Sequence, residues 1–312
     1  MALDTVIETN GLTRTFGSLT AVETLSLSIG RGEMFGIVGP DGSGKTTMIR
    51  MLCGILAPSA GSASVLGFDV VREADRIKRE IGYLSQRFSL YGDLSVDENI
   101  EFFAEINGVT SFEKMRNELL DFTRLTPFRE RMAEKLSGGM KQKLALACTL
   151  IHTPKIIFLD EPTTGVDPVS RRDFWRILQS LLKRGITIVM TTPYLDEAER
   201  CSRVAMMNRG SLLVVDTPDE VKKRMTGEII EVVCENVRDA QSLLKQQREV
   251  LEVQAFGDRL NIVLHDPKEI AGIRKALSEG GIAVQSWRKV EPSLENVFIS
   301  LITHSKIEEE LT

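Results

Sequence analysis

A glycine-rich stretch near the start of the chain has the residue types and spacing to hold phosphate groups. Residues 39–47, GPDGSGKTT, match the pattern G-x-x-x-x-G-K-[ST], after the apolar run MFGIV and before a helical pattern. Glycines let the backbone wrap closely around a phosphate with its N–H groups turned inward, and the following helix adds its positive dipole end. We therefore expect a phosphate-binding loop. Its residues are Gly39, Pro40, Asp41, Gly42, Ser43, Gly44, Lys45, Thr46 and Thr47.

Two side chains of this loop have predicted roles of their own. The ammonium group of Lys45 is expected to reach the β- and γ-phosphates, and the hydroxyl of Thr46 to ligate Mg²⁺. The alternative is a glycine-rich turn that fits the pattern by chance, which the strand before it and the helix after it disfavour. The loop therefore predicts binding of a nucleoside triphosphate with Mg²⁺.

Two neighbouring carboxylates, Asp160 and Glu161, stand at the end of a second apolar run, IIFLD at residues 156–160. Because apolar residues precede it, Asp160 is expected at the carboxyl end of a buried strand, where it would hold Mg²⁺ through water. Glu161 would point at the γ-phosphate, able to orient or deprotonate an attacking water molecule. Taken alone, the sequence LDEP fits a cap after a strand equally well.

The sequence LSGGMKQ contains a serine and two glycines at the start of another helical pattern. They are Ser137, Gly138 and Gly139. A serine hydroxyl and bare backbone amides at a helix start can bind an anion. An ordinary N-cap followed by two flexible glycines is the simpler interpretation of this segment by itself.

The elements that must position these groups alternate between strand and helix patterns. Residues 5–38 are predicted to form strands and turns. Apolar runs at residues 34–38, 156–160 and 186–190 are predicted to be central strands, each followed by a helical stretch. This alternation indicates an α/β fold with a largely parallel sheet. A helix-rich insert covers about residues 95–150.

The start of that insert and the C-terminal part of the chain carry further local signals. Ser95 and Glu98 have the spacing of a helix capping box. Towards the C-terminus the order is strand, helix, strand, strand, helix, strand, which is the split βαβ arrangement. We predict a first domain over residues 1–226, a small α+β ferredoxin-like domain over residues 227–304, and a solvated, frayed tail over residues 305–312.

Composition adds several exclusions. The net charge is −5 and the Lys and Arg residues are scattered, so we expect no nucleic-acid partner. No apolar run approaches the roughly 18 residues that cross a bilayer, and the first residues lack the pattern of a signal peptide. The cysteines show no paired spacing, which predicts buried thiols in a reducing compartment. They are Cys53, Cys148, Cys201 and Cys234.

In combination, the phosphate loop, LSGGMKQ, the strand ending in DEP and the following GVDP resemble the nucleotide-binding domains of ABC transporters, over residues 5 to about 225. The resemblance implies a P-loop NTPase domain of ABC type, with an antiparallel β subdomain and a helical insert. It also implies that two such domains sandwich two ATP molecules, each between one domain's phosphate loop and residues 137–139 of the other.

The resemblance implies roles for three more residues. Phe16 would stack on adenine, Gln86 would sense Mg²⁺ and the attacking water, and Asp167 in GVDP would communicate across the dimer. From residue type alone, Phe16 also fits a core position and Gln86 a polar surface position.

One position departs from the family pattern. In this family the strand after DEP ends in a histidine that contacts the γ-phosphate, in a setting like TTH-YLDEAE, whereas this chain has Pro193 in TTPYLDEAER. Its histidines, His152, His265 and His304, lie elsewhere. Proline has no side-chain donor and no backbone N–H, and loss of one positioned donor costs about 10²- to 10³-fold in rate. Proline also simply fits the end of a strand.

We therefore hypothesise that this chain binds ATP with Mg²⁺ but hydrolyses it slowly at its own site. Residues 137–139 would complete a competent site on a second, histidine-bearing ABC ATPase. Because Glu161 is present, some turnover is expected. The alternative is a non-catalytic regulatory subunit that binds ATP to lock a heterodimer.

The stretches LGFDVVREADRIKREIGYLSQ, TPDEVKKR and EPSLENVFISL look like those of drug-resistance exporters, in which ATPase and permease are separate chains. This implies an integral-membrane permease subunit as partner, which the segment after Gln86 would contact, and a cytoplasmic location on the inner face of the cell membrane. ABC importers share the ATPase core, and an ABC protein acting on nucleic acid or ribosomes is a further alternative, against which the acidic charge stands.

Overall fold

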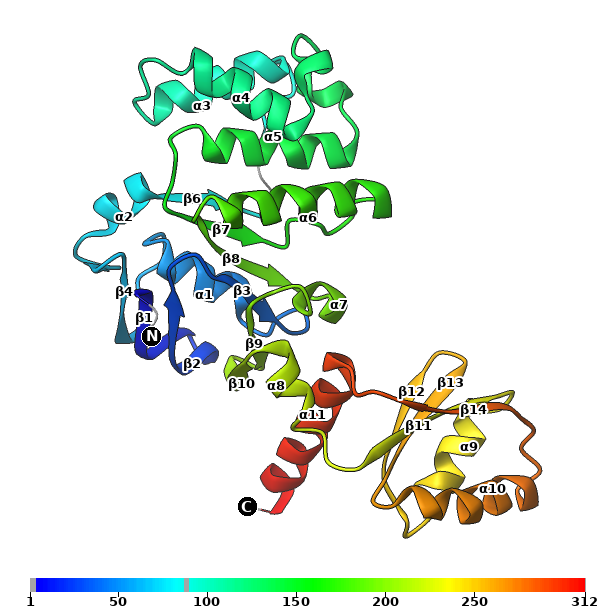
Figure 1. Cartoon of the computed structure of the whole chain (residues 1–312). Helices are drawn as coiled ribbons and strands as arrows, with labels where there is room; N and C mark the ends of the chain where they lie inside the picture. The colour runs from blue at the N-terminus through cyan, green and yellow to red at the C-terminus, as the bar shows by residue number, and fades with distance from the viewer. Residues whose placement is uncertain (1–3, 87–89, 312) are drawn as a thin grey trace. The chain divides into compact units, whose positions relative to one another are not determined.

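The structure is a computed structural model that describes residues 4–86 and 90–311 (Figure 1). The chain divides into two compact units, Met1–Val215 and Asp216–Thr312. The division precedes helix α8 (Pro218–Lys222), whereas the sequence predicted a boundary after residue 226. Helix α8 contacts the C-terminal helix α11 (Leu294–Leu311), so it belongs with the second unit.

The central sheet of the first unit has six strands in the order β10-β9-β3-β8-β7-β6. The pairs that join β9, β3, β8, β7 and β6 are all parallel, which confirms the predicted largely parallel sheet. The strands are β3 (Met34–Val38), β6 (Ile81–Leu84), β7 (Ile156–Asp160), β8 (Thr187–Thr192), β9 (Arg203–Asn208) and β10 (Ser211–Asp216).

The three central strands are buried along their whole length, as their continuous apolar runs predict. Strands β3 and β7 have the predicted bounds. Strand β8 begins one residue later than expected and continues to Thr192, because Thr191 and Thr192 pair with Ile37 and Val38 of β3. The carboxyl ends of these parallel strands therefore bring the phosphate loop, Asp160 and Thr191 to one edge of the sheet.

An antiparallel sheet in the order β2-β1-β4-β5 completes the first unit's β structure. The strands are β1 (Thr5–Phe16), β2 (Leu19–Gly30), β4 (Ala60–Val65) and β5 (Phe68–Asp69). Its inner side chains share one hydrophobic core with the central sheet and helix α1 (Lys45–Leu52), including Ile7, Ile29, Phe35 and Met48. The tight turn between β1 and β2 leaves Phe16 at the tip of the hairpin.

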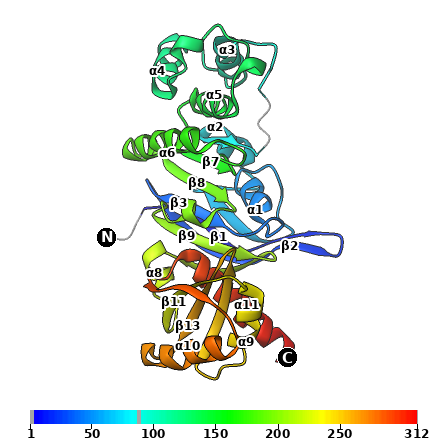
Figure 2. The same ribbon diagram turned by 90° about the vertical axis from the view of Figure 1, so that its right-hand side faces the viewer.

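The helical insert forms a group of its own beyond helix α6 (Pro168–Lys183) in Figures 1 and 2. It contains α3 (Val96–Ile106), α4 (Glu113–Thr123) and α5 (Gly138–Leu150), with short 3-10 turns at Thr126–Phe128 and Ala133–Lys135. The predicted capping box of α3 is confirmed, because Ser95 accepts from the Glu98 N–H while the Glu98 carboxylate accepts from the Ser95 N–H. The remaining helices of this unit are α2 (Ala74–Glu80) and α7 (Leu195–Ala198).

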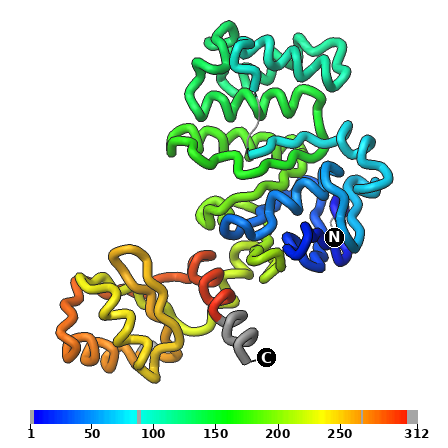
Figure 3. Tube along the Cα trace, turned by 180° about the vertical axis from the view of Figure 1, so that it is seen from behind, coloured from blue at the N-terminus to red at the C-terminus, as the bar shows by residue number. Residues whose placement is uncertain are grey.

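The second unit contains the predicted βαββαβ order. Its antiparallel sheet has the strand order β12-β13-β11-β14, and helices α9 and α10 lie side by side on one face of it (Figures 1 and 3). Ile230, Ile262 and Leu277 belong to its separate core. The elements are β11 (Glu228–Cys234), α9 (Val237–Leu244), β12 (Val250–Phe256), β13 (Arg259–Leu264), a 3-10 turn (Pro267–Glu269), α10 (Ile270–Glu279) and β14 (Val284–Val290).

Helix α11 continues to Leu311, whereas the sequence predicted a frayed tail from residue 305. The segment KIEEEL consists mostly of good helix formers, which prolong a helix that has already begun. None of the helices within the described residues is long and apolar enough to span a bilayer. All four cysteines are free and buried.

Candidate nucleotide site

The phosphate loop lies between β3 and α1, and its close packing explains two of its glycines. A Cβ at Gly39 would lie 2.2 Å from the Met207 carbonyl oxygen in β9. Gly44 has φ +101°, and a Cβ there would lie 2.3 Å from the Ala21 carbonyl oxygen. Only glycine fits this geometry, because any side chain would push the loop away from its neighbouring strands.

One cavity of about 420 Å³ collects most of the predicted nucleotide-binding residues. Phe16 and Gln86, whose places residue type alone left open, both line it, and Phe16 is 45% exposed instead of lying in the core. Leu19 and Ala21, from the next strand of the hairpin, could not be predicted from the sequence, because the exposure of Leu19 depends on the pairing of β1 with β2. The lining residues are Phe16, Leu19, Ala21, Asp41, Gly42, Ser43, Gly44, Lys45, Thr46, Thr47, Gln86 and Glu161.

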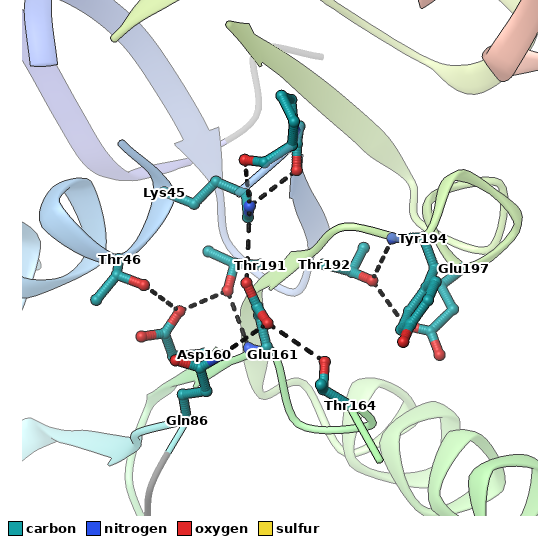
Figure 4. A network of polar contacts seen from close by, with 12 residues as sticks. Lys45, Thr46, Gln86, Asp160, Glu161, Thr164, Thr191, Thr192, Tyr194 and Glu197 are labelled. Atoms are coloured by element: carbon teal, nitrogen blue, oxygen red, sulfur yellow. Dashed lines mark hydrogen bonds and ion pairs between the residues drawn. The ribbon is translucent and has the colours of Figure 1, made fainter. Parts of the chain in front are cut away.

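Lys45 is almost fully buried and its ammonium group is held within the loop (Figure 4). Its Nζ donates to the carbonyl oxygens of Gly39, at 2.8 Å, and Pro40, at 2.9 Å. The carboxylate of Glu161 lies 3.6 Å from the same atom. Three oxygen atoms therefore satisfy the buried positive charge, at the position from which a lysine can contact phosphate oxygens.

Asp160 accepts hydrogen bonds through one carboxylate oxygen only. Oδ1 accepts from the hydroxyls of Thr46, at 3.0 Å, and Thr191, at 2.7 Å (Figure 4). Oδ2 is buried and has no hydrogen-bond partner among the described residues, and the same holds for the Ser43 hydroxyl. Buried polar atoms are nearly always paired, so both atoms fit a site that is completed by a ligand.

The donor set fits Mg²⁺. No cluster of three or more His, Cys, Asp or Glu residues that could hold a metal occurs in the part of the chain that the structure describes. Mg²⁺ does not require one, because it is usually bound by one or two oxygen ligands of the protein together with phosphates and water. The Thr46 hydroxyl and Asp160 Oδ2 supply oxygen atoms of this kind beside the phosphate loop.

Glu161 has a backbone conformation that non-glycine residues rarely adopt, with φ +49°. Such a conformation costs about 1–3 kcal/mol and persists only where the surroundings fix it. Here the Glu161 N–H donates to the hydroxyl and the carbonyl oxygen of Thr191, at 2.9 and 3.2 Å. Its carboxylate accepts from Gln86 Nε2 at 2.9 Å and from Thr164 Oγ1 at 3.3 Å. These contacts direct the carboxylate into the cavity.

Thr191 and Thr164 are functional neighbours that the sequence analysis did not identify. Thr191 stands within the quoted segment TTPYLDEAER, but its role depends on the pairing of β8 with both β3 and β7. Only that pairing brings its hydroxyl to Asp160 and to the Glu161 amide.

Ser137, Gly138 and Gly139 do not line this cavity; they lie at the start of α5 in the helical insert. Ser137 is the N-cap, and its hydroxyl accepts from the Met140 N–H at 3.3 Å. Asp167 is the N-cap of the neighbouring helix α6. Hydrogen bonds from the Ser170 hydroxyl and from backbone N–H groups hold the pKa of Asp167 below its ordinary value.

Pro193 follows β8 directly, in the half-buried turn that leads to α7, and it is not among the residues that line the cavity. On this edge of the sheet, the phosphate loop with its buried lysine and threonine hydroxyl, Gln86 and Glu161 line one cavity, and Asp160 lies behind Thr46. This arrangement can bind a nucleotide with Mg²⁺ and can orient a water molecule through Glu161.

Comparisons with known proteins agree with this geometry. Residues 22–164 match the ABC transporter family, and residues 217–302 match the C-terminal domain of DrrA1-3-like ATP-binding proteins. The daunorubicin/doxorubicin resistance ATP-binding protein DrrA of Streptomyces peucetius is 35% identical over an alignment of 309 residues, and the match covers 96% of this chain and 92% of DrrA. The chain belongs to the ATP-binding proteins of the ABC transporter family.

Two further relatives extend the comparison. The probable multidrug ABC transporter ATP-binding protein YbhF of Escherichia coli (strain K12) is 39% identical over 305 residues; the match covers 96% of this ABC protein and 52% of YbhF, so the chain spans about half the length of that relative. A solved dimeric ATP-binding cassette, in a post-hydrolysis state with ADP and Pi, superposes with a TM-score of 0.62 at 27% identity. That match covers 68% of this chain and 98% of the cassette. The first unit thus has the fold of an ABC ATPase.

Proposed function

We propose that this chain is the ATP-binding and ATP-hydrolysing subunit of an ABC exporter and that it drives a separate integral-membrane permease. The single observation that carries the proposal is the cavity at the carboxyl edge of the central sheet, where the phosphate loop, Phe16, Gln86 and Glu161 meet. The names of DrrA and YbhF, a drug-resistance and a probable multidrug protein, support export of a drug-like molecule.

In this proposal, each residue around the cavity has a role. The backbone amides of the phosphate loop and Lys45 bind the phosphates, and Phe16 stacks on the adenine. Thr46 and Asp160 hold Mg²⁺, which when bound neutralises phosphate charge. Glu161 orients and deprotonates the attacking water, and Gln86, whose amide lies 2.9 Å from the Glu161 carboxylate, links that carboxylate to the metal side of the site.

A second ATPase domain completes the site. Ser137, Gly138 and Gly139 lie at a helix N-terminus outside the chain's own cavity, a position suited to contact the ATP of a facing subunit. Asp167 is exposed at the start of the neighbouring helix, where it can communicate across such a dimer. The dimeric state of the similar solved cassette supports this arrangement. The facing subunit is a second copy or a histidine-bearing relative.

The permease is proposed to dock beside the helical insert. Of the segment after Gln86 that was predicted to contact it, residues 87–89 lie outside the described residues. Leu90 and Gly92 line a groove of about 360 Å³ together with Lys141 and Gln142 of α5. The Gln142 Oε1 atom in this groove is buried without a hydrogen-bond partner among the described residues, which fits an unfilled binding surface. Docking there places the chain at the inner face of the cell membrane.

We also propose that Pro193 weakens ATP hydrolysis at this chain's own site. The turn after β8 presents no imidazole, so one donor to the γ-phosphate is missing. The second candidate function, a regulatory subunit that only binds ATP, rests on this same residue. Glu161 favours the catalytic proposal, because its carboxylate is held towards the cavity by Gln86 and Thr164.

Two measurements test these proposals. Equilibrium dialysis of the full chain with ATP and Mg²⁺ should show binding that Lys45→Ala weakens strongly; no uptake by the unaltered chain would refute the function as a whole. Turnover should be low and should rise about 10²-fold on Pro193→His, since that change restores one positioned donor. Turnover of several per second that is unchanged by Pro193→His would remove the slow-site hypothesis. Absence of turnover in both the unaltered chain and Pro193→His, with ATP binding intact, would favour the regulatory subunit.

A further inference from the structure

A buried carboxylate outside the nucleotide cavity connects three segments of the first unit. Glu197 in α7 is 1% exposed, and its two oxygens accept hydrogen bonds from the Thr163 hydroxyl, at 2.7 and 2.8 Å, and from the Thr192 hydroxyl, at 2.9 Å. The Arg171 Nε atom lies 3.5 Å from the same carboxylate. Figure 4 shows Glu197 and Thr192 beside the nucleotide site but separate from the Asp160 and Glu161 contacts.

Two of these partners belong to segments that position the reacting groups. Thr163 stands two residues after Glu161, on the loop that leaves β7. Thr192 is the last residue of β8 and immediately precedes Pro193. Its hydroxyl also accepts from the Tyr194 N–H at 3.0 Å, so it spans the turn that contains Pro193. Pro193 has no side-chain donor of its own, so the turn is held by the hydrogen bonds of the Thr192 hydroxyl to Glu197 and Tyr194.

The third partner extends the connection to helix α6. The Arg171 guanidinium lies over the Tyr194 ring, 4.8 Å from its centroid, as well as near Glu197. Its neighbour Ser170 packs against the LSGG segment so closely that a Cβ at Gly139 would lie 2.3 Å from the Ser170 side chain. A shift of the first turn of α6 would therefore move the segment that is proposed to close the opposite ATP site.

A buried carboxylate is costly unless hydrogen bonds and an ion pair satisfy it, and then it tolerates little movement of its partners. We propose that Glu197 is a positioning residue that holds the loop after Glu161, the turn at Pro193 and the start of α6 in one fixed arrangement. It thereby couples the chain's own ATP site to its LSGG segment. This inference rests on the proposed ATPase function and assigns Glu197 no contact with nucleotide.

The test compares Glu197→Gln with Asp196→Asn in the full chain. Both changes neutralise one carboxylate in the same short helix, but Asp196 is exposed. Glu197→Gln keeps the size of the side chain and loses one acceptor oxygen and the ion pair with Arg171. We expect it to leave ATP affinity by equilibrium dialysis within about twofold and to lower the single-turnover hydrolysis rate at saturating ATP by about 10- to 100-fold, the effect of a misplacement of about 1 Å. Asp196→Asn should change neither quantity.

Hydrogen exchange supplies a readout that does not depend on hydrolysis. In Glu197→Gln, amide exchange should rise about tenfold or more around residues 161–164, 168–171 and 192–198, because local opening becomes easier there. Exchange in β3 should stay unchanged. Thr163→Val should lower the hydrolysis rate too, and its effect should not add fully to that of Glu197→Gln, since both changes weaken the contact between residues 163 and 197.

Three results would overturn the inference. The first is a hydrolysis rate in Glu197→Gln equal to that of Asp196→Asn, with unchanged exchange in the three segments. The second is increased exchange throughout the first unit, including β3, which indicates a general loss of stability. The third is an effect of Thr163→Val that adds fully to that of Glu197→Gln. Failure of the underlying function is distinguishable, because it appears as absent ATP binding in the unaltered chain.

Discussion

Replacement of Gly39 by alanine tests whether the packing of the phosphate loop sets nucleotide affinity. The new Cβ would lie 2.2 Å from the Met207 carbonyl oxygen and 2.8 Å from the Ser43 hydroxyl oxygen. Ordinary carbon–oxygen contacts are about 3.3–3.6 Å, so the loop and β9 must separate by about 1 Å. Overpacking of this kind costs about 1–3 kcal/mol of the free energy of unfolding.

The same shift should weaken ATP binding. If one backbone N–H loses its hydrogen bond to a charged phosphate oxygen, the loss is about 1.5–3 kcal/mol, or about 10- to 100-fold in the dissociation constant. Equilibrium dialysis measures the affinity. Stability is measured by urea unfolding in a Trp287→Phe background, because Trp175 in α6 is then the only tryptophan and reports on the first unit.

Gly272→Ala is the matched control. Gly272 lies in helix α10 of the second unit, and a Cβ there meets no atom within 4 Å. This variant should leave both the Trp175 transition and the ATP affinity unchanged. Wild-type affinity and stability in Gly39→Ala would refute the reasoning, because they would mean that the loop has free space beside β9.

Three further predictions concern other parts of the chain. Phe16→Ala should weaken ATP binding by about 1–3 kcal/mol, measured by calorimetric titration, because it removes the proposed stacking surface; an unchanged affinity would exclude Phe16 from the site. Ser95→Ala should lower the free energy of unfolding of the first unit by about 1 kcal/mol through loss of the capping box, and an effect near zero in urea unfolding would contradict that role. The Arg288 guanidinium holds the pKa of Glu231 below its ordinary value of 4.5. The pair therefore stabilises the folded second unit at neutral pH. This stabilisation is lost as the pH falls below 4.5 and through the lowered pKa of Glu231. Arg288→Met should make unfolding of that unit, followed by Trp287 fluorescence, less dependent on pH below 4.5, and an unaltered dependence would argue against the pair.

The groups with a fixed spacing along the chain could be predicted from the sequence, because a local pattern determines their geometry. The phosphate loop, the strand that ends at Asp160 and the βαββαβ order are of this kind. Contacts that depend on strand pairing could not. Thr191 reaches Asp160 only because β8 lies between β3 and β7, and Leu19 joins the cavity only because β2 folds back along β1.

The limits of the elements were also less predictable than their existence. Helix α11 runs past the predicted start of the tail, since helix formers continue an existing helix at little cost. The left-handed backbone of Glu161 could not be predicted either, because glutamate has no preference for that conformation. Hydrogen bonds of its N–H to Thr191 and of its carbonyl oxygen to the Thr164 N–H hold it there.

The two units have separate hydrophobic cores, one shared by both sheets of the first unit and one beneath the sheet of the second. Heat should therefore melt the protein in two steps, and a single melting temperature does not describe it. ATP with Mg²⁺ should raise the melting temperature of only the step that belongs to residues 1–215, since a ligand stabilises the unit that binds it. The nucleotide would thus set the thermal resistance of the first unit and leave that of the second unit unchanged.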